Sequence, residues 1–203
     1  KRQTCKVRKP WYVLEARSPA HVMVPIGHKR RPVVALSPNT ISSDNLVEVT
    51  LRQPKLAPML AGCILSAFVV MVYEIIGRAN FGQGLLKTQT YEIAQLPVLN
   101  PTAVAGDALQ AFEEAFAAVE FRSPLMIYDE VRRADRHALD DAFLCAVGFT
   151  DPAERADVLS ELHDTVCRMI WTRMAKAENT RESRQSYDEW LASGQPFGEV
   201  DEE

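Results

Sequence analysis

A chain of 203 residues with 47% hydrophobic content is long enough to bury a core and to form one or two small domains. Its formal net charge of −4 hides an asymmetry: residues 1–100 carry 13 Lys and Arg against 5 Asp and Glu, whereas residues 101–203 carry 10 against 22. This distribution excludes a uniformly charged surface. Two interpretations of the charge distribution remain open: the first half faces a polyanion such as DNA, or the two halves form unrelated solvated surfaces.

Cysteine usage and hydropathy narrow the class of protein further. Four scattered cysteines without a CxxC pair argue against a disulfide framework or a zinc knuckle and favour a reducing compartment. Met59–Tyr73 is the one run that resembles a membrane span, but its 15 uncharged residues are fewer than the ~20 that a bilayer requires. The chain shows no signal peptide, so we expect a cytoplasmic protein with no membrane contact. Because it opens at Lys1 rather than at Met, we expect a fragment of a longer protein.

The first 55 residues have the pattern of short strands joined by turns. Runs rich in β-branched or aromatic residues predict strands, and Pro, Gly, Ser and Asn lie between them. The predicted strands are Trp11–Leu14, Val22–Val24, Val33–Leu36 and Leu46–Leu51. In the last run Val47, Val49 and Leu51 alternate with polar residues, which predicts a half-buried strand.

One apolar helix is predicted to follow these strands. Pro58 is placed to begin it and Gly77 to end it, as helix start and stop signals require. The uncharged run Met59–Tyr73 lies between them, so we expect this helix to be buried.

Helical periodicity dominates the chain after Pro101, where apolar residues recur at spacings of three and four. The three apolar faces consist of Leu109, Phe112, Phe116 and Val119; of Leu139, Phe143 and Val147; and of Leu159, Leu162, Val166, Met169, Ile170 and Met174. Gly148 stops the second helix, and the capping box Asp151–Glu154, with proline at the first helical position, begins the third. The polar segment Glu178–Glu203 predicts a frayed helix end and a mobile acidic tail.

Together these patterns predict an α/β (α+β) fold in three parts. Residues 1–100 form a small mixed domain of short strands with one buried helix. Residues 101–177 form an all-helical segment, and residues 178–203 form the polar tail.

The segment Gly77–Pro101 carries the strongest functional signal. Gly82 and Gly84 allow the backbone to turn where a side chain would clash. The residue types around them donate hydrogen bonds to phosphates and to guanine and adenine edges, so the loop is a candidate reader of nucleic acid. The candidate contacts are Arg78, Asn80, Gln83, Lys87 and Gln89. Amides at loop tips can also be merely solvated, and a cofactor loop is less favoured because Phe81–Gly84 follows a helix rather than a strand.

Two further basic clusters could contact phosphate. They consist of Arg8 and Lys9, and of Lys29, Arg30 and Arg31. The second cluster lies in a turn between two predicted strands, so it is either a phosphate contact or a solvated hairpin tip. The positive first half of the chain favours phosphate contact. The first cluster could equally do no more than flank a strand.

Other reactive residue types are better explained by structure than by chemistry. His163 and Cys167 lie four residues apart, but two ligands without a third favour a packed pair over a metal site. Asp140 and Asp141 lack the partners of a divalent-ion site. Trp171 lies in an apolar pattern, so we expect it in the core.

Four motifs stand in the same order as in a known family. They are the basic residues before Trp11-Tyr12; the turn Ser42-Ser43-Asp44-Asn45; the run Gly77-Arg78, Gly82-Gln83-Gly84-Leu85-Leu86-Lys87, Tyr91-Glu92-Ile93, Leu96-Pro97; and Asp135-Arg136-His137-Ala138-Leu139-Asp140 followed by Val147-Gly148-Phe149. This order resembles the C-terminal target-recognition region of adenine-specific DNA methyltransferases of bacterial restriction-modification and related defence systems, over residues 6–177.

The resemblance implies a chain that binds double-stranded DNA and recognises its sequence, with the acidic helices facing away from the DNA. An upstream methyltransferase domain of the same protein would bind S-adenosylmethionine and transfer the methyl group. This chain contains no Pro-Pro dipeptide, so it lacks the family's Asp/Asn-Pro-Pro-aromatic motif that holds the flipped adenine. We therefore expect no catalytic, cofactor-binding or metal-binding residue in it.

An alternative of another class is a protein-interaction module of a multi-subunit defence complex without DNA contact. The acidic helical half and its amphipathic faces support this alternative, because such faces can dock on partner helices.

Overall fold

The computed structural model describes residues 18–36, 45–79, 84–178 and 186–193. In these ranges the strands form two small antiparallel sheets. The strands are β1 (Val22–Pro25), β2 (Gly27–His28), β3 (Ala35–Leu36), β4 (Leu46–Val49) and β5 (Leu86–Lys87). The first sheet has the order β3-β1-β4, with Met23 opposite Ala35 on one side and Glu48 on the other. The second sheet pairs β2 with β5.

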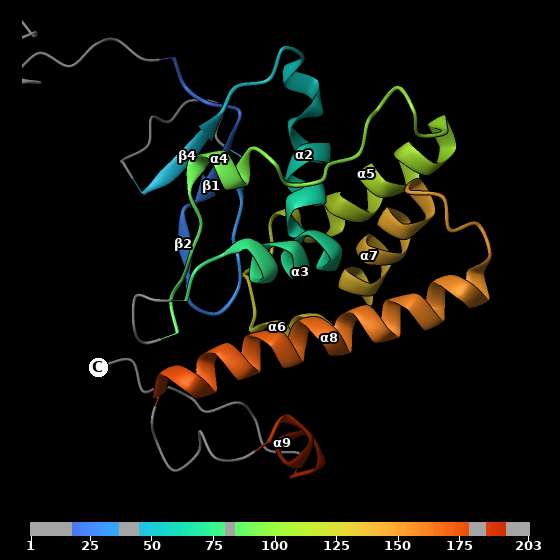
Figure 1. The fold of residues 1–203 in the computed structure, drawn as a ribbon. Helices are drawn as coiled ribbons and strands as arrows, with labels where there is room; N and C mark the ends of the chain where they lie inside the picture. The colour runs from blue at the N-terminus through green and yellow to red at the C-terminus, as the bar shows by residue number, and fades with distance from the viewer. Residues whose placement is uncertain (1–17, 37–44, 80–83, 179–185, 194–203) are drawn as a thin grey trace, which may run out of the picture.

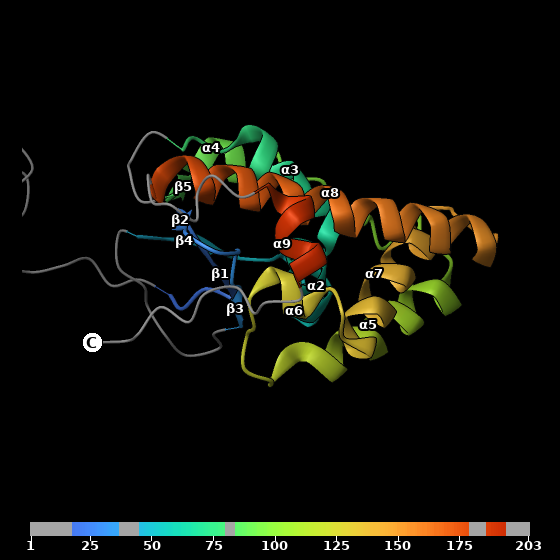
Figure 2. The same ribbon diagram turned by 90° about the horizontal axis from the view of Figure 1, so that it is seen from below.

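Helices make up most of the remaining structure. They are η1 (Pro54–Leu56), α2 (Ala57–Leu65), α3 (Ala67–Ile76), α4 (Thr90–Ile93), α5 (Gly106–Glu120), α6 (Ile127–Glu130), α7 (Ala134–Ala146), α8 (Pro152–Glu178) and α9 (Tyr187–Ser193). Figure 1 shows the strands and α4 gathered at one end of the molecule, α5 and α7 at the other, and α8 extending along both. Figure 2 shows from below that α9 lies beside α8. The predicted mixed α/β fold with a helical segment is confirmed.

The strand predictions differ in their outcome. β1 forms where it was predicted, whereas β4 ends at Val49, before the end of the predicted strand Leu46–Leu51; the side chains of Val47, Val49 and Leu51 pack on the core as the alternation requires. The predicted strand Val33–Leu36 is shorter, because only its last two residues pair with β1. The predicted strand Trp11–Leu14 lies outside the described residues.

The prediction of one continuous apolar helix is wrong, because two helices meet at Ser66. α2 and α3 are bent by 65° relative to each other. Ser66 is non-helical, and its hydroxyl accepts a hydrogen bond from the backbone N–H of Val69 at 3.4 Å, while Asp140 Oδ1 accepts one from Ala67 at 2.7 Å. These acceptors satisfy donors at the start of α3 that would otherwise be buried without partners. Gly77 ends α3 as predicted.

α2 and α3 lie between two hydrophobic clusters. The first cluster joins them to β1, α5 and α7 through side chains such as Val22, Phe112 and Phe143. The second joins α3 to α6, α8 and α9, and Ile170 is fully buried in it. Because the first cluster contains residues from both sides of position 100, the predicted domain and the predicted helical segment share one core.

A buried carboxylate connects three helices of this core. Asp140 of α7 accepts hydrogen bonds from Ala67 at the start of α3, and from Arg136 Nε at 2.7 Å; His163 Nε2 of α8 lies 2.9 Å from it. Burial alone would raise the pKa of Asp140, but Arg136 and His163 outweigh burial and hold it below its usual value. In the described ranges, no group of three or more His, Cys, Asp and Glu side chains is placed to hold a metal ion. His163 and Cys167 are both buried, as expected of a packed pair.

Part of the predicted mobile tail is a packed helix. Trp190 of α9 is 6% exposed, and its ring stacks on Trp171 of α8 with the ring centroids 5.0 Å apart. Tyr128 and Tyr187 lie against the same pair, so the expected core position of Trp171 is confirmed. Within the predicted tail, Tyr187–Ser193 thus forms a short helix whose aromatic side chains Tyr187 and Trp190 pack on Trp171 of α8.

None of the described helices is, by itself, both long enough and apolar enough to cross a membrane. The segments Pro54–Leu65 and Ala67–Ile76 meet the length and composition criteria only when taken together as a bent pair. Both segments contribute side chains to the hydrophobic clusters of the fold.

Candidate nucleic-acid interface

The two-stranded sheet brings together two basic segments that are far apart in the sequence. Gly27 of β2 lies opposite Lys87 of β5, and His28 lies opposite Leu86. The backbone N–H of Thr88 extends this pairing by donating to the carbonyl of Ile26 at 2.8 Å. Because β2 leads into residues 29–31 and β5 ends the loop that follows α3, the two predicted basic segments lie side by side.

The loop that follows α3 closes on itself at its base. Arg78 and Lys87 form an antiparallel bridge in which each backbone N–H donates to the other's carbonyl, at 2.9 Å and 3.0 Å. Gly84 has a φ of 70°, in the left-handed region that favours glycine, so the predicted turn at this residue is confirmed. It also lies against α8, since a Cβ at this position would come within 3.0 Å of Met174 Sδ.

Gly77 packs so closely on this loop that a side chain would displace it. A Cβ on Gly77 would lie 2.5 Å from Leu86 Cγ, and Leu86 is only 2% exposed. We therefore expect Gly77→Ala to lower the free energy of unfolding by about 1–3 kcal/mol through overpacking. Gly106→Ala at the start of α5 is the control: nothing lies within 4 Å of its Cβ position, so its stability should stay near or slightly above that of the wild type. Urea denaturation of both variants measures the difference, and equal stabilities would contradict the packing argument.

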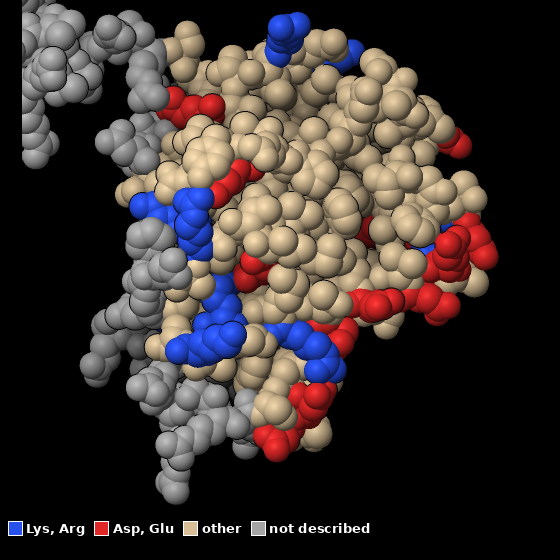
Figure 3. Space-filling view, in the orientation of Figure 1, with Lys and Arg blue, Asp and Glu red and all other residues tan. Residues whose placement is uncertain are grey.

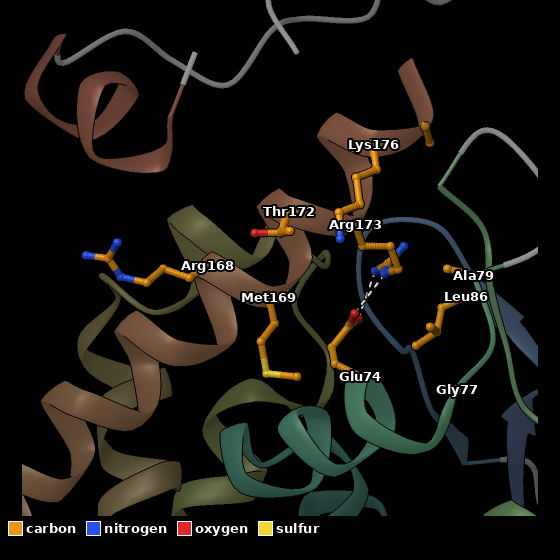
Figure 4. Close-up of a pocket in the computed structure, with 10 residues that line it drawn as sticks. Glu74, Gly77, Ala79, Leu86, Arg168, Met169, Thr172, Arg173 and Lys176 are labelled. Atoms are coloured by element: carbon orange, nitrogen blue, oxygen red, sulfur yellow. Dashed lines mark hydrogen bonds and ion pairs between the residues drawn. The ribbon is translucent and has the colours of Figure 1, made fainter. Parts of the chain in front are cut away.

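Arg173 of α8 ties the two basic segments to α3. Its Nε and Nη2 donate to the Glu74 carboxylate at 2.7 Å and 2.8 Å, as Figure 4 shows. Its Nη1 donates to the carbonyl of Lys29 at 2.8 Å and to the carbonyl of Gly84. His28 Nε2 lies 3.6 Å from the same carboxylate. Burial alone would raise the pKa of Glu74, but His28 and Arg173 outweigh it and hold the pKa below its usual value.

A groove of about 790 Å³ lies between this loop and α8. The wall formed by α3 and the loop consists of Glu74, Gly77, Ala79 and Leu86, and the wall formed by α8 consists of Arg168, Met169, Thr172, Arg173, Lys176 and Ala177. In Figure 4 Arg173 extends across the groove to Glu74, whereas Arg168 points away from it. The groove is therefore basic along α8 and mainly apolar along the loop.

The predicted contact residues occupy different surroundings. Arg30 is exposed, whereas Lys29, Lys87 and Gln89 are half-buried. Gln89 precedes α4, and its backbone N–H donates to Glu92 Oε2 at 2.7 Å, as in an N-terminal cap. The predicted contacts that lie outside the described residues are Arg8, Lys9, Asn80 and Gln83.

Arg78 lies at the surface, where two neighbours hold its guanidinium. Its Nη2 donates to the Tyr91 hydroxyl at 2.6 Å and to the Glu92 carboxylate, while the side chain remains 43% exposed. These partners raise the pKa of Arg78, Tyr91 through its hydrogen bond and Glu92 through its charge. The guanidinium is thus fixed in direction, and Glu92 offsets part of its charge.

Arg31 has a structural role, which corrects its assignment as a phosphate contact. Its Nη2 lies 3.2 Å from Oε1 of Glu130, and the two side chains are 11% and 1% exposed. Burial lowers the pKa of Arg31 to about 10, although Glu130 acts in the opposite direction. Arg122 shares the same carboxylate and continues the network to Asp135 at 2.7 Å. We therefore leave Arg31 out of the surface considered below.

The sequence analysis missed the contribution of α8 to this surface. It assigned the helical half as a whole to the acidic side, but α8 changes sign along its length. The first half carries four acidic residues and one basic residue (Glu154, Asp157, Glu161, Asp164 and Arg155), and the second half carries three basic residues and one acidic residue (Arg168, Arg173, Lys176 and Glu178). Figure 3 shows a cluster of Lys and Arg at the lower left, and Asp and Glu both at the right-hand end and beside that cluster at the bottom. If the charges had been counted separately for each half of this helix, the basic second half of α8 would have been recognised from the sequence.

Comparison with known proteins identifies the family. The family described as "Type II methyltransferase M.Eco57I, C-terminal domain" matches residues 1–131, which include both sheets, the loop after α3, and α6. No curated protein and no solved structure matches the chain. The match covers well over half of the 203 residues and confirms the resemblance seen in the sequence as far as residue 131; the motif at residues 135–149 lies beyond it. The chain therefore belongs to the family of C-terminal domains of the type II methyltransferase M.Eco57I.

Proposed function

We propose that this domain recognises double-stranded DNA and selects the target sequence of an adenine-specific, S-adenosylmethionine-dependent DNA methyltransferase. The upstream domain of the same protein would bind S-adenosylmethionine and transfer the methyl group, within a bacterial restriction-modification or defence system. Membership of the family supports a place beside a catalytic methyltransferase domain. The basic loops support contact with DNA.

The observation that carries this proposal is the pairing of β2 with β5. This pairing joins the segment after His28 to the loop that begins at Gly77, although neither would form a stable basic surface alone. Two loops held together at one edge can contact neighbouring phosphates of one duplex in a fixed register.

We assign different tasks to the residues on this surface. Arg30, Lys87 and Arg78 would contact phosphates, which supplies affinity and register but no sequence information. Arg30 is exposed, whereas Glu92 offsets part of the charge of Arg78. The amides of Asn80, Gln83 and Gln89 would read base edges, since Asn and Gln pair with adenine through two hydrogen bonds.

Charge reversal tests this proposal. We expect the double variant Arg30→Glu/Lys87→Glu to bind a fluorescent DNA duplex at least about tenfold more weakly at ~0.1 M salt, with a salt slope smaller by about two. The physical reason is that each lost phosphate contact releases about one counterion fewer. Fluorescence anisotropy across a salt series measures both quantities, and thermal melting shows whether each variant is folded.

A matched control carries the same charge change on another face. Arg52 and Lys55 are exposed and lie before α2, away from the paired loops. Arg52→Glu/Lys55→Glu should bind within about twofold of the wild type, apart from a weak long-range effect. Wild-type binding that does not depend on salt, or equal losses in both double variants, would rule out the proposed surface.

One observation favours the alternative function as a protein-interaction module. An apolar groove of about 420 Å³ lies between α3, α7 and α8, with Met71, Val147 and Phe149 among its lining residues. If the upstream methyltransferase domain docks there, the groove is compatible with DNA recognition by the opposite, basic end. If docking is the only function, the wild-type domain shows no salt-dependent duplex binding in the anisotropy experiment.

A further inference from the structure

We infer that the second half of α8 is a separate phosphate-binding element, formed by Arg168, Thr172 and Lys176. We call these three residues the α8 ridge. The inference rests on the proposed function and extends it to a part of the chain beyond the family match at residues 1–131. The ligand is the phosphate backbone of the same duplex that the loops contact.

The ridge residues share one face of the helix. They are spaced four residues apart, so they follow one another along α8 at a rise of about 6 Å. All three side chains are exposed. Two cations with a hydroxyl donor between them provide hydrogen-bond donors along one line, which suits a row of phosphate oxygens.

The ridge lies along one groove with the proposed DNA-binding loop, although the Arg168 side chain points away from that groove. Its three residues line the wall formed by α8, and Gly77, Ala79 and Leu86 line the wall opposite. Glu74 on the opposite wall is buried and paired with Arg173, so the exposed donors on the α8 wall form the charged side of the groove. A nucleic-acid strand that lies on the loop therefore passes beside the ridge.

The hydrogen bonds of Arg173 fix the position of the α8 ridge relative to the loop. This side chain lies on α8 between Thr172 and Lys176, but it is 6% exposed and is fully engaged with Glu74 and with backbone carbonyls at Lys29 and Gly84. It holds α8 against both basic loops without adding to the exposed charge. The ridge and the loops thus form one preorganised surface, which lowers the cost of ordering them on binding.

The ridge cations differ in their restraint. Arg168 is held by Asp164 of α8 and by Asp188 of α9, and its guanidinium lies 5.0 Å from the ring centroid of Tyr187. Among the described residues, no acidic side chain forms an ion pair with Lys176. Lys176 is therefore the cation that is ready to bind, and Arg168 must exchange exposed carboxylate partners for phosphate, an exchange that weak surface ion pairs permit.

A simpler role for Lys176 is stabilisation of the helix end. It lies in the last turn of α8, where a cation interacts favourably with the helix dipole. This role predicts a loss of helix stability on charge reversal but no loss of DNA affinity. Thr172 is not in the last turn, so the dipole explanation does not extend to it.

Two single variants test the ridge by duplex anisotropy on the whole chain. We expect Lys176→Glu to bind about five- to tenfold more weakly at ~0.1 M salt, with a salt slope smaller by about one. Thr172→Glu, which places a carboxylate in the middle of the ridge, should also weaken binding several-fold. Lys55→Glu carries the same charge change as Lys176→Glu in η1, and it should bind within about twofold of the wild type.

The outcomes separate this inference from the proposed function. If Arg30→Glu/Lys87→Glu weakens binding but Lys176→Glu and Thr172→Glu match the Lys55→Glu control, the ridge is overturned and the function stands. If Lys176→Glu lowers the melting temperature as well as the affinity, the duplex affinity of Thr172→Glu decides between the two roles. Wild-type affinity in Thr172→Glu would then overturn the inference that the ridge binds phosphate. If the wild type itself shows no salt-dependent duplex binding, the proposed function fails first.

Discussion

Asp140→Asn should lower the free energy of unfolding by about 3–5 kcal/mol, because it leaves a buried guanidinium without its counter-charge. Arg136 is 3% exposed, and Asp140 is the carboxylate that pairs with it at 2.7 Å. Nη2 of Arg136 already has no hydrogen-bond partner among the described residues. The charges of Arg31 and Arg136 also act on each other, so removal of Asp140 adds repulsion to desolvation.

The adjacent carboxylate provides a matched control for this variant. Asp141 is 43% exposed and pairs with Arg155 at 2.8 Å, and Arg155 also donates to the carbonyls of Phe149 and Thr150. Asp141→Asn makes the same chemical change one residue away, and it should cost no more than about 1 kcal/mol because exposed ion pairs are weak. Urea denaturation at pH 7 measures both variants, and equal losses would show that the buried network is not the cause.

The same variant should also change how stability depends on pH. The pKa of Asp140 is lower in the folded chain than its usual value. Its contribution to stability is therefore complete above about pH 4, the range of an unfolded Asp, and is lost as the pH falls through the folded pKa. Asp140→Asn removes that contribution at every pH, so its stability should fall less steeply than that of the wild type between about pH 4 and pH 2. If the stability of Asp140→Asn fell as steeply with decreasing pH as that of the wild type, the acid sensitivity would come from other carboxylates, such as Asp135, whose pKa is about 2.

Patterns that extend over many residues could be predicted from the sequence, because many residues contribute to each of them. The apolar stripe along α8 was predicted from Leu159 to Met174, and Val166, Ile170 and Met174 are all buried. β4 was equally clear, because alternation leaves only one face for Val47 and Val49. In both cases packing against the core and local propensity favour the same structure.

Short elements were not readable, because their stability comes from residues distant in sequence. β2 and β5 contain two residues each, which is too few to show a period. Next to these strands, Arg173 of α8 donates hydrogen bonds to the carbonyls of Lys29 and Gly84, a long-range contact that no local pattern shows. The break at Ser66 had a local signal, since serine is a good N-cap, but the apolar run around it concealed the signal.

The candidate site was predicted in its residue types more than in its geometry. The loop from Arg78 to Lys87 was identified because glycine, cations and amides coincide there. The same criterion selected Arg31, which is buried against Glu130, because a basic residue in a turn has the same sequence pattern whether its partner is a phosphate or a distant carboxylate. The buried position of Trp190 was not predicted for the opposite reason, since scattered aromatic residues in a polar tail show no periodicity.

Arg173→Met should destabilise the chain by about 3–5 kcal/mol, since it leaves Glu74 buried without its main partner and two carbonyls without their donor. The side chains of Glu74 and Arg173 are 2% and 6% exposed. Glu74→Gln should cost less, because the amide keeps one acceptor oxygen for the guanidinium. The double variant Glu74→Gln/Arg173→Met should be close to Arg173→Met alone, with a coupling energy of about 1–3 kcal/mol that urea denaturation of all four proteins measures. Additive losses would mean that the two side chains do not act as one unit. The contacts of Arg173 with the carbonyls of Lys29 and Gly84 need a separate test: if they hold the basic loops in register, Arg173→Met should bind the duplex more weakly than the wild type under conditions where both are folded.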